Sequence, residues 1–298
     1  MEEKNSRRSV LKSIAGGAAA LSAGLFVPGS LQAFESIEEK KSWKLKGKIN
    51  HSVCKWCYGS IPLDDFCKAA KEMGISSVEL LGPDEWPTLK KYGLTCAMPW
   101  GAGKGISEGF NDEKFHDELI ASYEGIFPKL AAAGYDKVIC FSGNRKGISD
   151  EQGLQTAAKG LKRLMKSAEK YKVTMTMELL NSKVDHKDYQ CDNTKWGIDL
   201  VKLVGSENFK LLYDIYHMQI MEGDVIRTIK NNHKYFSHYH TGGVPGRNEI
   251  DATQELNYPA IMQAIVDTGY KGHVAQEFIP KKTDKLASLK DSIRICDV

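Results

Sequence analysis

The sequence has few of the features of a nucleic-acid-binding protein or of a small disulfide-stapled scaffold. Its 41 lysines and arginines nearly balance 38 aspartates and glutamates, and only eight histidines occur in 298 residues. A formal charge of +3 provides no strongly basic surface for nucleic acid. Seven cysteines are an odd number, in a chain too long for a disulfide-dense domain. We therefore expect a globular protein that acts on a small molecule and binds no nucleic acid.

The glycine motifs of nucleotide-binding proteins are also missing. The glycine-rich stretch 101–109 (GAGKGISEG) contains neither GxGxxG nor GK[ST]. We interpret it as a flexible loop at the rim of the fold. Cys54 and Cys57 form a CxxC, but no second CxxC completes a zinc site. We interpret these cysteines as buried or disulfide-forming thiols, with redox chemistry or zinc binding as the alternative.

No apolar run is long enough for a comfortable membrane span, but the first 33 residues have the pattern of an export signal. Residues 6–12 (SRRSVLK) contain a twin arginine, and an Ala/Gly-rich stretch follows over 14–27. We predict a twin-arginine signal over 1–33, cleaved near Ala33, and a charged linker over 34–47. The protein would then be periplasmic, with the twin-arginine export machinery as a partner. A retained N-terminal anchor is the alternative, because Leu31 is larger than the residue usually found three before a cleavage site.

From Ile49 onward, strand-like runs alternate with helical segments. The expected strands are 49–58, 77–81, 94–99, 137–141, 173–181, 209–214, 236–243 and 273–280. The expected helices begin after Pro62 and Pro83 and cover about 112–133, 150–170, 196–204, 225–231, 258–268 and 284–298. Eight such units over about 250 residues predict an α/β fold, a single (β/α)8 TIM barrel over 48–298. An open doubly wound sheet is the alternative, but no glycine fingerprint marks a dinucleotide crevice.

Four successive strand-like runs each end on a residue that can bind a metal. These residues are Glu178, Asp214, His240 and Glu277. Each alone would be read as a salt-bridged or helix-capping residue, but the ends of parallel barrel strands converge at one face. Three carboxylates and an imidazole form a hard site, suited to Mg²⁺, Mn²⁺ or Co²⁺ better than to Zn²⁺. We therefore predict a divalent metal site, with Mg²⁺ or Mn²⁺ as the cofactor.

Four further polar residues are candidates for substrate binding. His217 follows Asp214 by three residues and would touch a substrate oxygen or support a ligand, unless it is a satisfied rim histidine. Arg247 follows a Pro-Gly turn, and its planar fork suits a carboxylate, unless it is an exposed loop residue. His186 and Glu79 are weaker candidates. The expected partner is a small hydroxy acid, oxo acid or sugar, and self-association into a homo-oligomer is left open.

Several runs resemble hydroxypyruvate isomerases, a family of xylose isomerase-like barrels. The resemblance covers about 49–280 and is carried by Ile139–Gly153 (ICFSGNRKGISDEQG), Met177–Tyr189 (MELLNSKVDHKDY), Leu211–Asp224 (LLYDIYHMQIMEGD), His238–Glu249 (HYHTGGVPGRNE) and Ala275–Pro280 (AQEFIP). The VDH, DIYHxQ and VPGR segments are its most specific parts. The twin-arginine leader departs from the family, because most relatives are cytoplasmic.

The resemblance implies a function. Glu178, Asp214, His240 and Glu277 would bind the metal, and Glu178 and Glu277 would also be the catalytic acid/base pair. The reaction would interconvert hydroxypyruvate and tartronate semialdehyde through an enediol, by proton transfer between the two glutamates. The alternatives are a ketose 3-epimerase or another sugar isomerase of this barrel class, and an exported sugar-acid-binding protein without catalysis.

Overall fold

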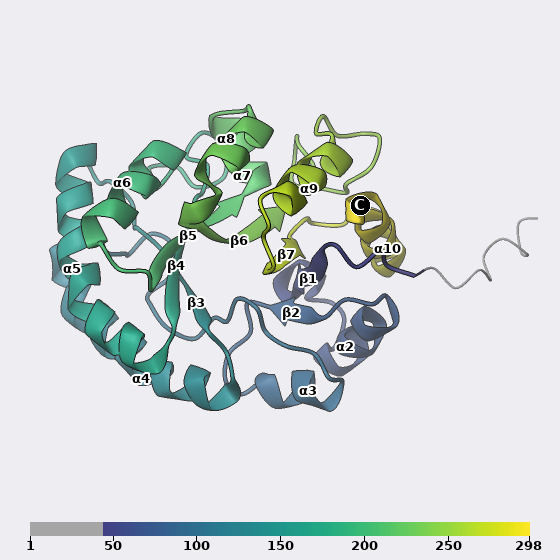
Figure 1. Cartoon of the computed structure of the whole chain (residues 1–298), viewed down its shortest axis with the longest axis horizontal. Coiled ribbons are helices and arrows are strands. Elements are labelled where there is room, and N and C mark those ends of the chain that lie inside the picture. Colours follow the sequence, from purple (N-terminus) through teal and green to yellow (C-terminus); the bar gives the residue numbers. More distant parts are fainter. Residues whose placement is uncertain (1–43) are drawn as a thin grey trace, which may run out of the picture. The chain divides into compact units, whose positions relative to one another are not determined.

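Seven parallel strands form one curled sheet in the computed structural model, which describes residues 44–298. The order of the strands is β2-β1-β7-β6-β5-β4-β3 (Figure 1). The predicted export signal and residues 34–43 of the predicted linker lie outside the described residues. The strands are β1 Asn50–Cys54, β2 Ser77–Glu79, β3 Lys137–Cys140, β4 Thr174–Glu178, β5 Phe209–Asp214, β6 Phe236–Thr241 and β7 His273–Gln276.

The eighth barrel position, between β2 and β3, is filled by an irregular segment. We predicted a strand over 94–99, and this segment does bridge the gap: the Leu80 N–H donates to the Met98 carbonyl at 2.9 Å, and the Ile139 N–H donates to the Pro99 carbonyl at 3.2 Å. A single parallel bridge between Ser77 and Thr95 is its regular part. Pro99 has no N–H, so a continuous ladder cannot form there. The prediction of a barrel is confirmed, but that of a regular third strand is wrong.

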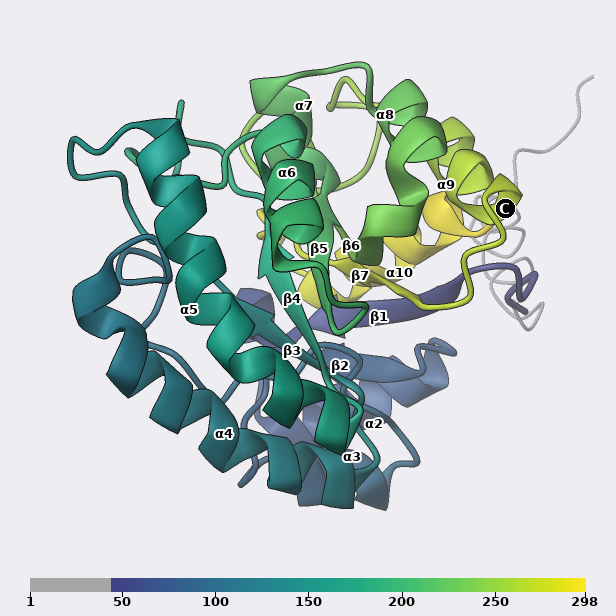
Figure 2. The same ribbon diagram turned by 60° about the vertical axis from the view of Figure 1, so that its left-hand side comes forward.

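The helices lie on the outside of the curled sheet (Figures 1 and 2). They are α2 Leu63–Glu72, α3 Trp86–Lys91, α4 His116–Ala133, α5 Asp150–Tyr171, α6 Thr194–Val204, α7 Ile215–Met221, α8 Val225–Asn232, α9 Tyr258–Asp267 and α10 Lys285–Cys296, with 3₁₀ turns η1 Lys55–Tyr58, η2 Glu113–Phe115 and η3 His233–Tyr235. None of the helices in the described part of the chain is long and apolar enough to cross a membrane.

Local sequence signals fix several helix ends. Ser149 and Gln152 form a capping box at the start of α5, which satisfies two otherwise free N–H groups. Gly134 and Gly205 end α4 and α6 with φ of 81° and 72°, a conformation that favours glycine. These are stops that the sequence predicts.

Two elements near the strand ends differ from the prediction. β1 ends at Cys54, and 55–58 turns into η1 instead of continuing the strand. Residues 215–221 form α7 directly after β5, where no helix was expected.

All seven cysteines are buried and free, so the disulfide interpretation is wrong and the buried-thiol interpretation is confirmed.

The end of the predicted linker already packs on the barrel. The Lys46 N–H donates to Asp297 Oδ2 at 2.8 Å, and Lys46 Nζ donates to the Asp297 carbonyl at 3.0 Å. Leu45 lies so close to Gly74 that a Cβ there would be 2.8 Å from the leucine Cδ1. Within the described residues, the contacts of the barrel therefore reach back to Leu45.

Candidate metal centre and active site

The parallel register brings the predicted ligands to one layer at the carboxyl ends of the strands. Asp214, the last residue of β5, pairs with His240 on β6. Glu178 ends β4. The Glu277 N–H donates to the Thr241 carbonyl at 2.9 Å, which holds it one residue beyond β7. In the described residues one ligand atom from each of these four side chains lies within 4.8 Å of the others. The structure thus brings the predicted metal ligands together.

Asp214 has a second role in the local fold. Its Oδ1 accepts the backbone N–H of His217 at 3.1 Å, so Asp214 is the N-cap of α7. The cap fixes the carboxylate orientation and leaves Oδ2 facing the cluster, 3.5 Å from Arg247 Nη2. The short helix after β5 therefore positions a candidate ligand.

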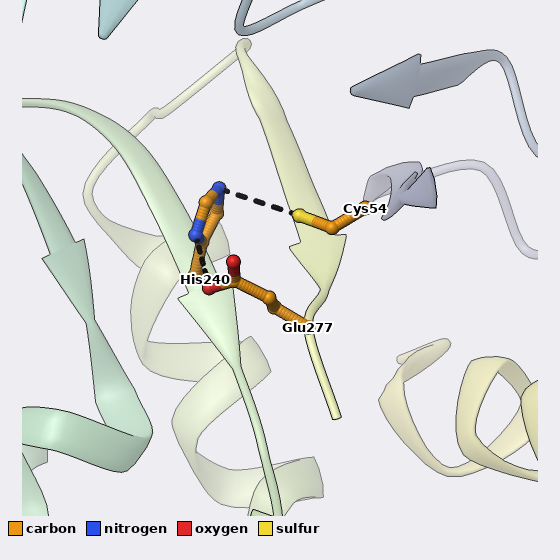
Figure 3. Close-up of side chains that lie close together, drawn as sticks. All are labelled: Cys54, His240 and Glu277. Carbon is orange, nitrogen blue, oxygen red and sulfur yellow. Dashed lines mark hydrogen bonds and ion pairs between the residues drawn. The ribbon is translucent and has the colours of Figure 1, made fainter. Parts of the chain in front are cut away.

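His240 contacts different groups through its two ring nitrogens. Nδ1 faces the carboxylates, at 2.7 Å from Glu277 Oε2 and 3.2 Å from Glu178 Oε1. Nε2 faces away, at 3.3 Å from Glu79 Oε2 and 3.8 Å from Cys54 Sγ. Figure 3 shows the ring between the Cys54 thiol and the Glu277 carboxylate. Nδ1 is thus the nitrogen available to a cation in the cluster.

Glu79 lies behind His240 and does not line the cavity, contrary to its prediction as a substrate-binding residue. It is fully buried, and its Oε2 accepts from His238 Nε2 at 2.8 Å as well as from His240. Burial alone would raise the pKa of Glu79, but the charges and hydrogen bonds of His238 and His240 hold that pKa well below its ordinary value. An ionised Glu79 can only accept, so it favours a proton on His240 Nε2. Burial would lower the pKa of His240, but its acidic surroundings, Cys54 and Glu277 foremost, hold that pKa well above its ordinary value, so a bound cation would take the place of the proton on Nδ1.

Ionisation of all three carboxylates would give the cluster more negative charge than its protein partners neutralise. Burial and the charge of Glu277 raise the pKa of Glu178, and burial raises the pKa of Asp214 to about 8. Burial would also raise the pKa of Glu277, but Arg247 and His240 hold it well below its ordinary value. Each pKa that rises marks a carboxylate whose ionised form requires a further positive charge.

The residues present fit a divalent metal. Glu178 Oε1 and Asp214 Oδ2 are buried oxygens without a hydrogen-bond partner among the described residues. Their ion-pair contacts include His240 Nδ1 and Arg247 Nη2, and a cation bound by these atoms would offset the cost of burying their charge. Cys54 also lies near His240, but burial raises the pKa of its thiol well above the ordinary value. The three carboxylates and His240 therefore fit a divalent metal better than a site that includes the Cys54 thiolate would.

A cavity of about 460 Å³ opens over this cluster. Glu178, Glu277, Arg247 and His186 form its polar part. Six apolar side chains form much of the rest: Leu80, Trp100, Ile106, Ile139, Phe141 and Leu180. The predicted catalytic glutamates therefore face a space that holds a small molecule.

Arg247 is held rigidly in the polar part of the cavity. Its Nη2 lies 2.6 Å from Glu277 Oε2, and its Nε donates to the Glu277 carbonyl at 3.2 Å. The guanidinium lies over the rings of Trp56 and Tyr216, with centroids at 5.2 and 5.5 Å. Its φ of 56° is uncommon outside glycine, and such strain is typical of functional positions. Arg247 is therefore not an exposed loop residue.

The two candidate histidines differ in position. His186 lines the cavity, and burial together with the nearby Arg247 lowers its pKa. His217 is fully buried and does not line the cavity. Its Nδ1 accepts from the Asn181 amide at 2.7 Å, which directs Nε2 toward Asp214 Oδ2 at 3.7 Å. His217 thus lies behind the candidate ligand Asp214, and His186 faces the cavity.

Trp56 is a site residue that we did not predict. Its Nε1–H donates to Glu277 Oε1 at 2.7 Å, and its ring lines the cavity although 45% of the residue is exposed. Trp56 lies two residues beyond the end of β1, so it reaches the same carboxyl-end face of the barrel as the candidate ligands. Reading β1 as a longer strand hid that signal.

Comparison with known proteins places the chain in a family. A family model described as a xylose isomerase-like TIM barrel matches residues 67–296. The chain belongs to the xylose isomerase-like TIM barrel family. The 2-oxo-tetronate isomerase of Cupriavidus necator is 30% identical over 236 residues, which cover 74% of this chain and 87% of that protein. The hydroxypyruvate isomerase of Escherichia coli is 30% identical over 191 residues, which cover 63% of this chain and 71% of that protein.

Solved structures confirm the fold of this family. A protein from Brucella melitensis described as AP endonuclease, family 2 superposes with a TM-score of 0.71 at 23% identity, covering 81% of this chain and 97% of that one. This likeness concerns the fold alone. The sequence relatives confirm the resemblance to hydroxypyruvate isomerases, and the chain is an isomerase of this barrel class.

Proposed function

We propose that this xylose isomerase-like barrel interconverts hydroxypyruvate and tartronate semialdehyde by a metal-assisted proton transfer. The same proposal includes the equivalent reaction of a longer acid with the same reacting carbons. The observation that carries the proposal is the convergence of Glu178, Glu277 and Arg247 on one cavity. Two relatives of similar sequence are named hydroxypyruvate isomerase and 2-oxo-tetronate isomerase.

The two glutamates would act as the acid/base pair. One removes a proton from carbon 3 of hydroxypyruvate, giving an enediol, and the other returns a proton to carbon 2 while the hydroxyl proton moves from O3 to O2. Both carboxylates are nearly buried, with 4% and 3% exposure, so water has little access to the transferred proton. Trp56 would hold Glu277 through its Nε1–H.

Glu178, Asp214, His240 and Glu277 would hold the metal, for which we propose Mg²⁺ or Mn²⁺. When bound, such an ion supplies Lewis-acid stabilisation of negative charge on the substrate oxygens. Arg247 Nη1 makes no hydrogen bond to residues 44–298, so it is free to bind the substrate carboxylate. His186 would contact the remaining oxygens.

The test is an assay of metal-stripped protein, resupplied with Mg²⁺ or Mn²⁺, on hydroxypyruvate, longer 2-oxo acids and ketohexoses. We expect metal-dependent turnover of at least one acid, and its loss in Glu178→Gln. Turnover of neutral sugars alone would reassign the protein as an epimerase or sugar isomerase. Normal turnover by a folded Glu178→Gln protein would refute the acid/base role, and silence on every substrate would favour a binding protein.

We also propose that the protein is exported by the twin-arginine route. The support is the arginine pair at Arg7 and Arg8, followed by an apolar stretch. Replacing both arginines with lysine should keep the full-length protein in the cytoplasm, as measured by cell fractionation. Equal periplasmic amounts of both forms would refute the route.

A further inference from the structure

The cavity is larger than a three-carbon substrate requires. Its volume of about 460 Å³ lies in the range of pockets that enclose drug-sized ligands. At roughly 30 Å³ per water molecule, it holds about fifteen water-sized groups. Hydroxypyruvate, with about seven non-hydrogen atoms, would fill about half of that space. The other half is available to further substrate atoms.

The chemistry of the cavity changes from one side of the barrel to the other. The charged side chains Glu178, Glu277 and Arg247 come from the ends of β4 and β7 and from the loop after β6, beside the apolar Leu180. The other wall is apolar: Leu80 follows β2, Trp100 and Ile106 belong to the irregular segment and the loop 101–109, and Phe141 follows β3. Trp100 and Ile106 are only half-buried, and the Trp100 ring lies 5.5 Å from that of Phe141. A three-carbon acid bound at the charged side would leave this apolar surface in water.

The loop that carries Ile106 is held in place. The Gly103 N–H donates to Ser122 Oγ at 3.0 Å, and Lys104 Nζ lies 2.6 Å from Glu118 Oε1, so two contacts tie 101–109 to α4. Gly103 has φ of 87°, and a Cβ there would lie 3.0 Å from the Tyr123 hydroxyl, which requires glycine. The expected rim loop thus borders the cavity and is attached to α4.

Backbone strain also marks the apolar side. Leu80 has φ of 60°, which is unfavourable for a bulky residue, and its N–H is bonded to the Met98 carbonyl. Strain of this kind persists where the surrounding structure imposes it, commonly at ligand sites. The left-handed backbone of Leu80 lies at the end of β2, where the chain borders the cavity.

We propose that the substrate is a hydroxy-oxo acid of about six carbons, whose non-reacting body packs against Leu80, Trp100, Ile106 and Phe141. This inference rests on the proposed function, since it takes the reacting carbons to lie at the glutamates and the carboxylate at Arg247. Trp100 and Ile106 are then the residues that set substrate length.

The test compares kcat/KM for hydroxypyruvate and for 3-hydroxy-2-oxo acids of four and six carbons, whose extra carbons form an alkyl chain, with Mn²⁺-loaded protein. We expect kcat/KM to be at least about 10-fold higher for the six-carbon acid. Ile106→Ala should lower the six-carbon to three-carbon ratio about 10-fold, because it removes apolar contacts with the longer acid alone. Ile279→Ala is the matched control: Ile279 is 44% exposed and lies outside the cavity lining, so the ratio should stay unchanged.

The outcomes separate this inference from the proposed function. A wild-type preference for hydroxypyruvate, or a ratio unchanged in both Ile106→Ala and Trp100→Ala, would overturn the six-carbon inference and leave the isomerase proposal intact. No turnover of any acid would overturn the isomerase proposal. In that case, titration of tryptophan fluorescence with the six-carbon acid still decides the inference: weaker binding to Ile106→Ala than to Ile279→Ala supports it, and equal binding refutes it.

Discussion

Replacing Glu79 with glutamine tests whether this buried carboxylate prepares His240 for metal binding. Glu79 Oε2 accepts from His238 Nε2 at 2.8 Å and lies 3.3 Å from His240 Nε2. A glutamine in that place has one acceptor oxygen and one donor NH₂. The glutamine lacks the negative charge that favours a proton on His240 Nε2, and a His240 that keeps its proton on Nδ1 cannot bind a cation there. We therefore expect Glu79→Gln to weaken metal binding.

The expected loss is about 10- to 100-fold in metal affinity, the usual cost of removing a partner that orients a metal-ligating histidine. That range corresponds to about 1.4–2.7 kcal/mol of binding free energy. Isothermal titration of metal-stripped protein with Mn²⁺ measures it directly, without any substrate. Thermal unfolding of the same samples shows whether the variant is folded.

Asp297→Asn is the matched control. Asp297 is also a buried carboxylate beside a histidine, with its Oδ1 3.7 Å from His51 Nε2, but it contacts none of the candidate ligands. Its loss should leave the Mn²⁺ affinity unchanged. If folded Glu79→Gln binds Mn²⁺ as tightly as the wild type and Asp297→Asn, Glu79 does not set the proton position of His240, and the reasoning fails.

Three further predictions concern catalysis, substrate binding and acid stability. Glu277→Gln should lower kcat at least 100-fold, the lower end of what a general acid or base contributes; a fall below 10-fold in steady-state assays would contradict its role. Arg247→Lys should raise KM for the acid substrate about 10-fold, because the Nη1 contact to the substrate carboxylate is lost; an equal effect on a neutral ketose would show that the carboxylate is not its target. Burial lowers the pKa of His51 to about 4 in the folded protein, so at intermediate pH the unfolded chain binds a proton there and the folded protein does not. The stability that depends on neutral His51 is therefore complete above about pH 6.5 and is lost as the pH falls toward 4. The loss in the free energy of unfolding is about 3 kcal/mol. Urea unfolding at pH 7 and at pH 4.5 should therefore show a smaller decrease in this free energy for His51→Asn than for the wild type; equal decreases would exclude His51 as the cause.

The ligand cluster could be predicted because its signal lies within each strand. Glu178 and Asp214 each follow an apolar run, and a parallel barrel brings such strand ends together without any knowledge of side-chain packing. His240 and Glu277 follow the same rule. Their convergence depends only on strand order and register, which the alternation of strands and helices already implies.

Other parts depend on contacts between segments far apart in sequence. Glu79 ends β2 and looked like a rim residue, yet its partners His238 and His240 lie about 160 positions later. Nothing local indicates that its side chain turns into the barrel interior. Trp56 was missed because the break from β1 into η1 was read as strand, and α7 was missed because its cap, Asp214, was already interpreted as a ligand.

The positions of the polar and apolar sides suggest why the reaction and the substrate can vary separately. The metal-binding side lies at the ends of β4 to β7, where the hydrogen-bonded register fixes each side chain relative to its neighbours. The apolar side includes the irregular segment 94–100 and the loop 101–109, which are attached by isolated hydrogen bonds. Changes in that loop alter the shape of the cavity without moving a ligand. Under the six-carbon proposal, Trp100 and Ile106 set substrate length and the metal cluster does not, so the same four ligands can serve barrels that differ in substrate.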